Sequence, residues 1–130
     1  MIRKDGEGKP QSPVEHIALP VKVSRKAVEE IQVIVQKIIE GYAPQRIILF
    51  GSYAHGEPNE DSDLDLLIIK GTSERPMDRH LRVRRLVSTP GRRLSFDPLV
   101  LTPEEINERL SIGDQFVQDI LAQGDVLYAS

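Results

Sequence analysis

Residues 50–69 read FGSYAHGEPNEDSDLDLLII. Gly51 and Ser52 directly follow the apolar run RIILF, which predicts a buried strand over 46–50. Asp63 and Asp65 stand at the head of a second apolar run, which predicts a strand over 64–69. Because side chains alternate along a strand, both carboxylates are expected to project to the same side. The stretch therefore predicts a strand, a tight turn, an acidic loop and a second strand that starts with paired carboxylates.

A third carboxylate, Asp97, lies in a later apolar run, SFDPLVL, within a strand predicted over 94–101. If this strand lies beside the second one, Asp97 can reach the same site. Hard oxygen ligands of this kind select Mg²⁺ or Mn²⁺ rather than zinc. Gly51 would let the backbone approach a phosphate, and Ser52 offers an N–H and a hydroxyl as the cap of a short helical turn. The pattern predicts a metal–phosphate site.

A calcium loop is an alternative reading of the same acidic segment. Asp61, Asp63 and Asp65 fit positions 1, 3 and 5 of an EF-hand loop. The glycine required at position 6 is Leu66, however, and the glutamate required at position 12 is Thr72. The calcium reading is therefore rejected.

The remaining segments alternate between helix and strand. Ser24 is a good N-cap for a helix that should end before Gly41. A second helix is predicted from Pro76 to Val87, and Thr102 with Glu105 forms a capping box that starts a third. After a break at Gly113, a helix over 114–122 and a short strand over 126–128 complete the chain. This order predicts an α/β (α+β) fold with a mixed four-stranded sheet flanked by helices.

Composition limits the class of protein. The 130 residues predict one domain over 24–130, preceded by a flexible N-terminal extension over 1–23. The absence of cysteine excludes disulfides and cysteine-ligated zinc. A net charge of −3 argues against nucleic acid as a direct ligand. The sequence shows neither a signal peptide nor an apolar run of about 20 residues, so we expect a cytoplasmic protein with no membrane partner.

These motifs carry a resemblance to a known family. GSYAHG followed by DSDLDLLI matches the GS-x10-D-x-D signature of the nucleotidyltransferase superfamily related to DNA polymerase beta. FDPLV resembles the strand that holds the third carboxylate of that family. The chain is similar to the minimal nucleotidyltransferases (MNT), including the antitoxins of HEPN–MNT toxin–antitoxin pairs. Its arginine-rich stretch ERPMDRHLRVRRL is also similar to that subgroup.

The resemblance implies a polymerase beta-like fold and a protein adenylyltransferase. ATP would place its triphosphate on Gly51 and Ser52. One or two Mg²⁺ ions, or Mn²⁺ in their place, would bind to Asp63, Asp65 and Asp97. Asp97 would also help to deprotonate the acceptor hydroxyl. AMP would pass to a partner protein, with a tyrosine of a cognate HEPN toxin as the expected acceptor.

Several alternatives stay open at the level of sequence. The chain could neutralise a partner by docking alone, or transfer the nucleotide to an RNA or small-molecule hydroxyl. His55 stands where many relatives have Arg or Lys, which would weaken nucleotide binding or make it pH-sensitive, unless His55 only caps the turn. The arginines between 75 and 93 are either a surface for an acidic partner, RNA or nucleotide phosphate, or a solvated helix face paired with the acidic loop.

Overall fold

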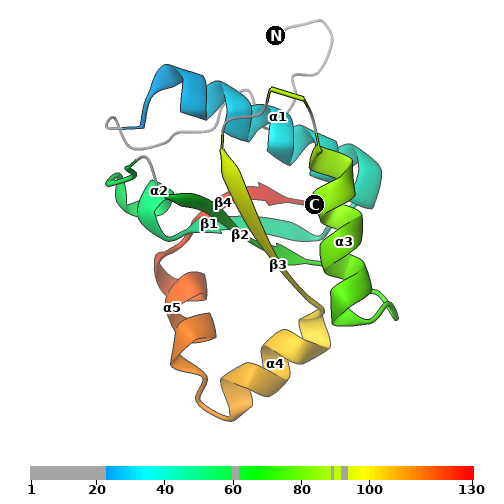
Figure 1. Ribbon diagram of the computed structural model, residues 1–130. Coiled ribbons are helices and arrows are strands. Elements are labelled where there is room, and N and C mark those ends of the chain that lie inside the picture. The colour runs from blue at the N-terminus through cyan, green and yellow to red at the C-terminus, as the bar shows by residue number, and fades with distance from the viewer. Residues whose placement is uncertain (1–22, 60–61, 89, 92–93) are drawn as a thin grey trace, which may run out of the picture.

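A computed structural model describes residues 23–59, 62–88, 90–91 and 94–130. Its strands form one mixed sheet in the order β3-β2-β1-β4, in which β2 and β3 are parallel and the other pairs antiparallel (Figure 1). The predicted mixed four-stranded sheet flanked by helices is confirmed. The strands are β1 (Arg46–Phe50), β2 (Asp63–Ile69), β3 (Ser95–Leu101) and β4 (Asp125–Ala129). The helices are α1 (Arg25–Tyr42), α2 (Ser52–His55), α3 (Pro76–Val87), α4 (Pro103–Ser111) and α5 (Gln115–Gln123).

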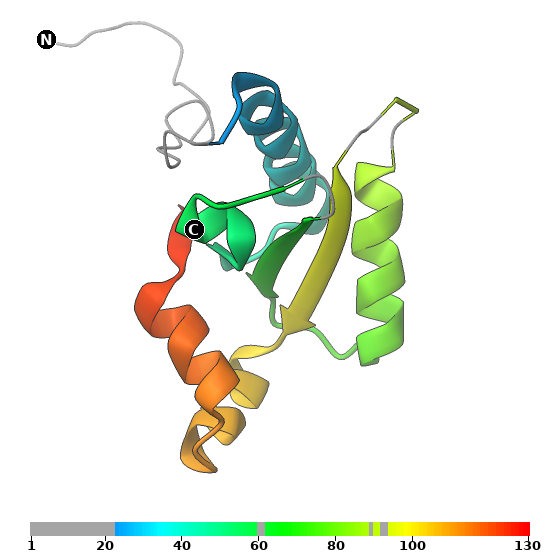
Figure 2. The ribbon, with the colours of Figure 1, turned by 60° about the vertical axis from the view of Figure 1, so that its left-hand side comes forward.

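Helices cover the sheet on both faces (Figure 2). Leu64, Leu66 and Ile68 of β2 are buried in the cluster that α1 and α3 complete. Leu67 and Ile69, which alternate with them, are buried in the cluster that α4 and α5 complete. Side chains at odd positions of β2 therefore face α4 and α5, and this is the side on which the aspartates at its start project.

Helix α1 begins as predicted but ends later than predicted. The Ser24 hydroxyl accepts a hydrogen bond from the Ala27 N–H at 3.1 Å, which is an N-cap. The helix then runs through Gly41, and Ala43 takes the left-handed conformation at φ 50°. The glycine serves packing instead, because a Cβ at Gly41 would lie 2.5 Å from Cδ2 of Leu86 in α3.

No helix in the described part of the chain is long and apolar enough to cross a membrane.

The predicted extension over residues 1–23 lies outside the described residues, apart from Val23. Val23 is buried and belongs to the cluster beneath α1 and α3. Val23 therefore contributes to the core from just before the cap of α1.

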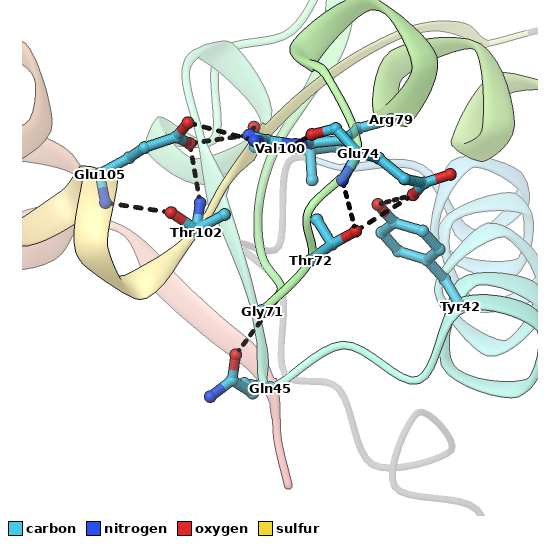
Figure 3. Close-up of polar contacts among 9 residues, drawn as sticks. All are labelled: Tyr42, Gln45, Gly71, Thr72, Glu74, Arg79, Val100, Thr102 and Glu105. Carbon is cyan, nitrogen blue, oxygen red and sulfur yellow. Dashed lines mark hydrogen bonds and ion pairs between the residues drawn. The ribbon is translucent and has the colours of Figure 1, made fainter.

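Arg79 is an internal residue rather than part of an arginine-rich surface. Its side chain is 6% exposed and donates two hydrogen bonds to the Glu105 carboxylate, at 2.7 and 3.2 Å (Figure 3). Glu105 also accepts from the Thr102 N–H at 2.9 Å, while the Thr102 hydroxyl accepts from the Glu105 N–H. The predicted capping box is confirmed, and it is coupled to a buried ion pair. The expectation that all the arginines lie on a surface was wrong for Arg79, because the carboxylate compensates its charge.

The outer edge of β3 is closed by side chains of α3. Among the described residues no strand pairs with this edge, and α3 supplies a partner to three of its backbone carbonyls. The atom pairs are Phe96 O with the Arg84 guanidinium at 3.1 Å, Pro98 O with His80 Nδ1 at 3.2 Å, and Val100 O with the Arg79 guanidinium at 3.4 Å. Pro98 has no N–H to leave unpaired, which suits an edge position.

A polar network holds the end of β2 that lies away from the aspartates. The Gly71 N–H donates to Oε1 of Gln45 at 2.9 Å, and the Tyr42 hydroxyl donates to Glu74 at 3.4 Å (Figure 3). The Glu74 N–H also donates to the Thr72 hydroxyl at 3.1 Å. The connection from β2 to α3 is thereby tied to α1 and β1.

Candidate active site

The structure brings the three aspartates onto two adjacent strands. Asp63 is the first residue of β2, one position earlier than predicted, and Asp65 follows on the same side. In the parallel ladder, Asp65 pairs directly with Asp97 of β3, and Asp63 pairs with Ser95. Asp65 is half-buried, whereas Asp63 and Asp97 are exposed. The third predicted strand therefore lies where Asp97 can act beside Asp65.

Three acidic side chains lie close together around Asp65. The pKa of the Asp65 carboxyl is raised to about 6, first by burial and then by the neighbouring carboxylates of Asp97 and Asp63. Like charges this close disfavour one another's ionised form. A cation at this position would remove the repulsion, so the electrostatics suit a metal site.

Gly51 packs directly against the Asp65 carboxylate. Its backbone has φ 77° and ψ −156°, a combination that only glycine adopts readily. A Cβ at this position would collide with Oδ2 of Asp65. The turn after β1 and the carboxylates of β2 are thus in contact, and glycine is required by both conformation and space.

Ser52 does not cap α2, contrary to the prediction. It is the first residue of the helix, and Gly51 is the N-cap, with no side-chain capping bond. The Gly51 carbonyl accepts from the N–H groups of Ala54 at 3.0 Å and His55 at 3.1 Å. The difference arises because the unusual backbone of Gly51 turns the chain one residue earlier than a serine cap requires. His55 ends the helix and is exposed.

Phe50 is a residue of this region that the sequence reading treated only as the end of a strand. It pairs with Asp65 across the antiparallel ladder, so both side chains project from the same face. Its ring contacts that of Phe116 in α5, with centroids 5.7 Å apart and planes at 81°. Alternation from Ile48 could have placed Phe50 on the aspartate face, but its contact with Phe116 depends on the tertiary fold.

The donor set fits a divalent cation. Carboxylate oxygens are the ligands that Mg²⁺ and Mn²⁺ prefer, and three of them occupy neighbouring ladder positions. Within residues 23–59, 62–88, 90–91 and 94–130, however, no three or more His, Cys, Asp or Glu side chains are grouped so that they could hold a metal ion by themselves. A cation at the aspartates would therefore need further ligands, such as oxygens of a substrate.

Comparison with known proteins identifies the family. Residues 32–130 match the family described as "Polymerase beta, Nucleotidyltransferase". The chain belongs to this nucleotidyltransferase family. Members generally use a nucleoside triphosphate and a divalent metal, which agrees with the chemistry of the three aspartates.

Two individual proteins are similar to parts of this nucleotidyltransferase. A protein of Methanocaldococcus jannaschii named a "putative protein adenylyltransferase" is 41% identical over 64 residues, covering 47% of this chain and 44% of the relative. The chain thus spans less than half of that relative's length. The crystal structure of a "putative nucleotidyltransferase" from Sulfolobus solfataricus superposes with a TM-score of 0.51 at 24% identity, covering 79% of this chain and 85% of the other. The second likeness supports the fold.

Proposed function

We propose that this nucleotidyltransferase transfers AMP from ATP to a hydroxyl of a partner protein. The triphosphate would lie along Gly51 and Ser52, and the three aspartates would hold one or two Mg²⁺ ions. The observation that carries the proposal is one continuous contact: the Gly51 backbone packs on the Asp65 carboxylate, and Asp65 pairs with Asp97 across the ladder. A phosphate on the turn is therefore beside the carboxylates.

At phosphorus the reaction forms one P–O bond and breaks another, and the acceptor hydroxyl gives up its proton. The acceptor oxygen attacks the α-phosphorus of ATP, and the bond from that phosphorus to the bridging oxygen breaks, so that pyrophosphate leaves. Asp97, which is exposed, is the carboxylate that would accept the proton of the attacking hydroxyl. Divalent cations, when bound, neutralise the charge that develops on the phosphate oxygens.

Each residue of the site has a separate task. Asp63 and Asp65 supply oxygen ligands on one side of β2, and phosphate oxygens would complete the coordination. Gly51 admits the triphosphate to within reach of its backbone. Positioning and charge neutralisation would account for most of the rate enhancement, as in other phosphoryl-type transfers.

A protein hydroxyl is the acceptor that the available similarities favour. The Methanocaldococcus relative bears the name of a protein adenylyltransferase, although the match covers 44% of its length. The motif resemblance to MNT antitoxins narrows this proposal to a tyrosine of a HEPN toxin.

Intact-mass spectrometry tests the proposal. The purified chain is incubated with ATP, Mg²⁺ and the candidate HEPN partner. We expect the partner to gain one or more AMP units, and peptide mapping should locate them on a tyrosine. Asp63→Ala with Asp65→Ala should abolish the gain. Asp78→Ala, which removes an exposed aspartate of α3, should leave it intact and serves as the matched control.

The alternatives give different results in the same experiment. Co-elution of the two proteins with no mass gain would overturn transfer and favour a docking module. AMP found on RNA or on a small molecule instead would keep the transfer and change the acceptor. Full activity in the double aspartate variant would exclude these residues as the site.

A further inference from the structure

Two aromatic rings adjoin the site that the proposed function uses. Phe50 ends β1, and Phe116 lies in the first turn of α5. The rings meet edge to face, with centroids 5.7 Å apart. The chain has three phenylalanines, and the third, Phe96, is buried in the cluster on the opposite face of the sheet. The Phe50–Phe116 pair is thus the phenylalanine pair on the aspartate face.

The pair is continuous with the turn and the carboxylates. Phe50 immediately precedes Gly51 and pairs with Asp65 in the ladder. Reading across the sheet, the order is Asp97, Asp65, Phe50 and then Phe116 of α5. A molecule whose phosphates lie at Gly51 would therefore have an aromatic surface directly beside it.

Phe116 is not needed to hold α5 on the sheet. Val117 and Ile120 are fully or almost fully buried and anchor this helix in its cluster. Phe116, in contrast, is 52% exposed and lies outside that cluster. An edge-to-face contact also leaves both faces of the edge-on ring free of the other ring. An exposed aromatic surface of this kind, next to a site, is suited to a ligand.

We propose that the Phe50–Phe116 pair is the binding site of the nucleotide base, and that it selects purine over pyrimidine nucleotides. This inference rests on the proposed function, because it presumes that the triphosphate lies at Gly51 and the aspartates. Stacking on an aromatic ring depends on the area of the base rather than on its hydrogen-bonding edge. The pair should therefore accept ATP and GTP to a similar degree and bind CTP and UTP less tightly.

Equilibrium binding by isothermal titration calorimetry separates the base from the phosphates. Mg²⁺–ATP is one probe, and Mg²⁺ with inorganic tripolyphosphate, which has no base, is the other. Phe116→Ala and Phe116→Leu should each weaken ATP binding about tenfold, because neither keeps a ring for stacking. Both should bind tripolyphosphate as the wild type does. Phe116→Tyr retains the ring and should bind ATP normally.

A neighbouring residue supplies the matched control. Ile112 precedes α5 and is 77% exposed, so Ile112→Ala removes apolar surface without removing a ring. It should bind both probes as the wild type does. Circular dichroism and thermal unfolding of each variant check that α5 remains folded, and Phe116→Leu keeps apolar bulk at the Phe50 contact.

The outcomes distinguish this inference from the proposed function. A wild type that binds neither probe overturns both. If the wild type binds ATP, and Phe116→Ala and Phe116→Leu bind it equally well, the base-binding role of the pair is overturned and the proposed function is not. An equal loss of ATP and tripolyphosphate binding also overturns that role, because the ring would then act on the site as a whole. Weakened binding of the acceptor protein, with ATP binding intact, would reassign Phe116 to the acceptor.

Discussion

Arg79 and Glu105 join α3 to the start of α4 through a two-point ion pair. The Arg79 side chain is 6% exposed, whereas that of Glu105 is 32% exposed. The guanidinium also donates to the backbone carbonyls of Glu74 and Val100. The arginine is therefore the buried partner, and Glu105 supplies the charge that makes its burial tolerable.

Replacing Glu105 with Gln should destabilise the fold by about 2 kcal/mol. Glutamine can still accept the capping bond from Thr102, but it leaves the Arg79 charge buried without a counter-charge. Urea unfolding at pH 7 measures the change. Glu104→Gln is the control, because Glu104 is exposed in the same helical turn and its substitution should cost less than about 0.5 kcal/mol. Equal losses in the two variants would show that the ion pair contributes nothing specific.

The same ion pair should make stability depend on acid. Hydrogen bonds from Arg79 hold the pKa of the Glu105 carboxyl below its usual value. As pH falls, the unfolded chain therefore takes up this proton before the folded chain does. The contribution of Glu105 is complete at neutral pH, begins to fade near the ordinary glutamate pKa of about 4.3, and is lost below the folded value. Melting temperatures of the wild type and Glu105→Gln should therefore converge as the pH falls below the ordinary glutamate pKa. A gap that stays constant with pH would contradict this.

Gly51→Ala should reduce nucleotidyl transfer about 100-fold or more. The alanine would have to adopt a glycine-only conformation, and its Cβ would displace the Asp65 carboxylate. Gly113→Ala is a closely matched control, since Gly113 has φ 78° and an added Cβ there meets nothing within 4 Å. Transfer rates and urea unfolding are measured for both variants. Activity loss confined to Gly51→Ala identifies the contact with Asp65 as the cause, while similar losses in both would point to backbone strain alone.

Asp65→Asn should stabilise the metal-free protein by about 1 kcal/mol at pH 8, after allowance for solvent screening. The substitution removes the carboxylate that burial and two like charges disfavour. It should also abolish transfer, together with the rise in melting temperature that we expect Mg²⁺ to give the wild type. Asn59→Asp, in the preceding loop, changes charge in the opposite sense outside the ladder, and the Mg²⁺ response should survive it. A destabilised Asp65→Asn protein would contradict the repulsion.

Short-range signals predicted most of the fold. The two apolar runs around Gly51, the capping box at Thr102 and the N-cap at Ser24 each depend on a few neighbouring residues. They appear in the structure within one residue of their predicted places. Likewise, strand alternation was enough to place Asp63 and Asp65 on one side.

The Ser52 cap failed for a local reason, the backbone conformation of Gly51, but what else the sequence missed or left conditional depends on contacts between distant segments. Gly41 was predicted to follow the end of α1, but it lies inside the helix, where the Leu86 side chain of α3 packs closely against it. Arg79 lies in an arginine-rich stretch that was expected on the surface, but it is buried and pairs with Glu105. The pairing of Asp97 with Asp65 was conditional on strand order, and the contact of Phe50 with Phe116 had no sequence signal. In each case the partner is remote in the chain, so no local pattern encodes it.

The closed edge of β3 has a consequence for the choice of acceptor. Side chains of α3 satisfy its outer carbonyls, and among the described strands β3 is the outermost, so Asp97 stands at the margin of the sheet. If the proposed acceptor is a protein, it could reach this exposed carboxylate without entering an enclosed chamber. The sheet would then not limit the size of the acceptor. Selectivity among acceptors would depend on the surface residues that bind them outside the site. Proteins with the same catalytic residues could then modify different acceptors through changes in their surface residues alone.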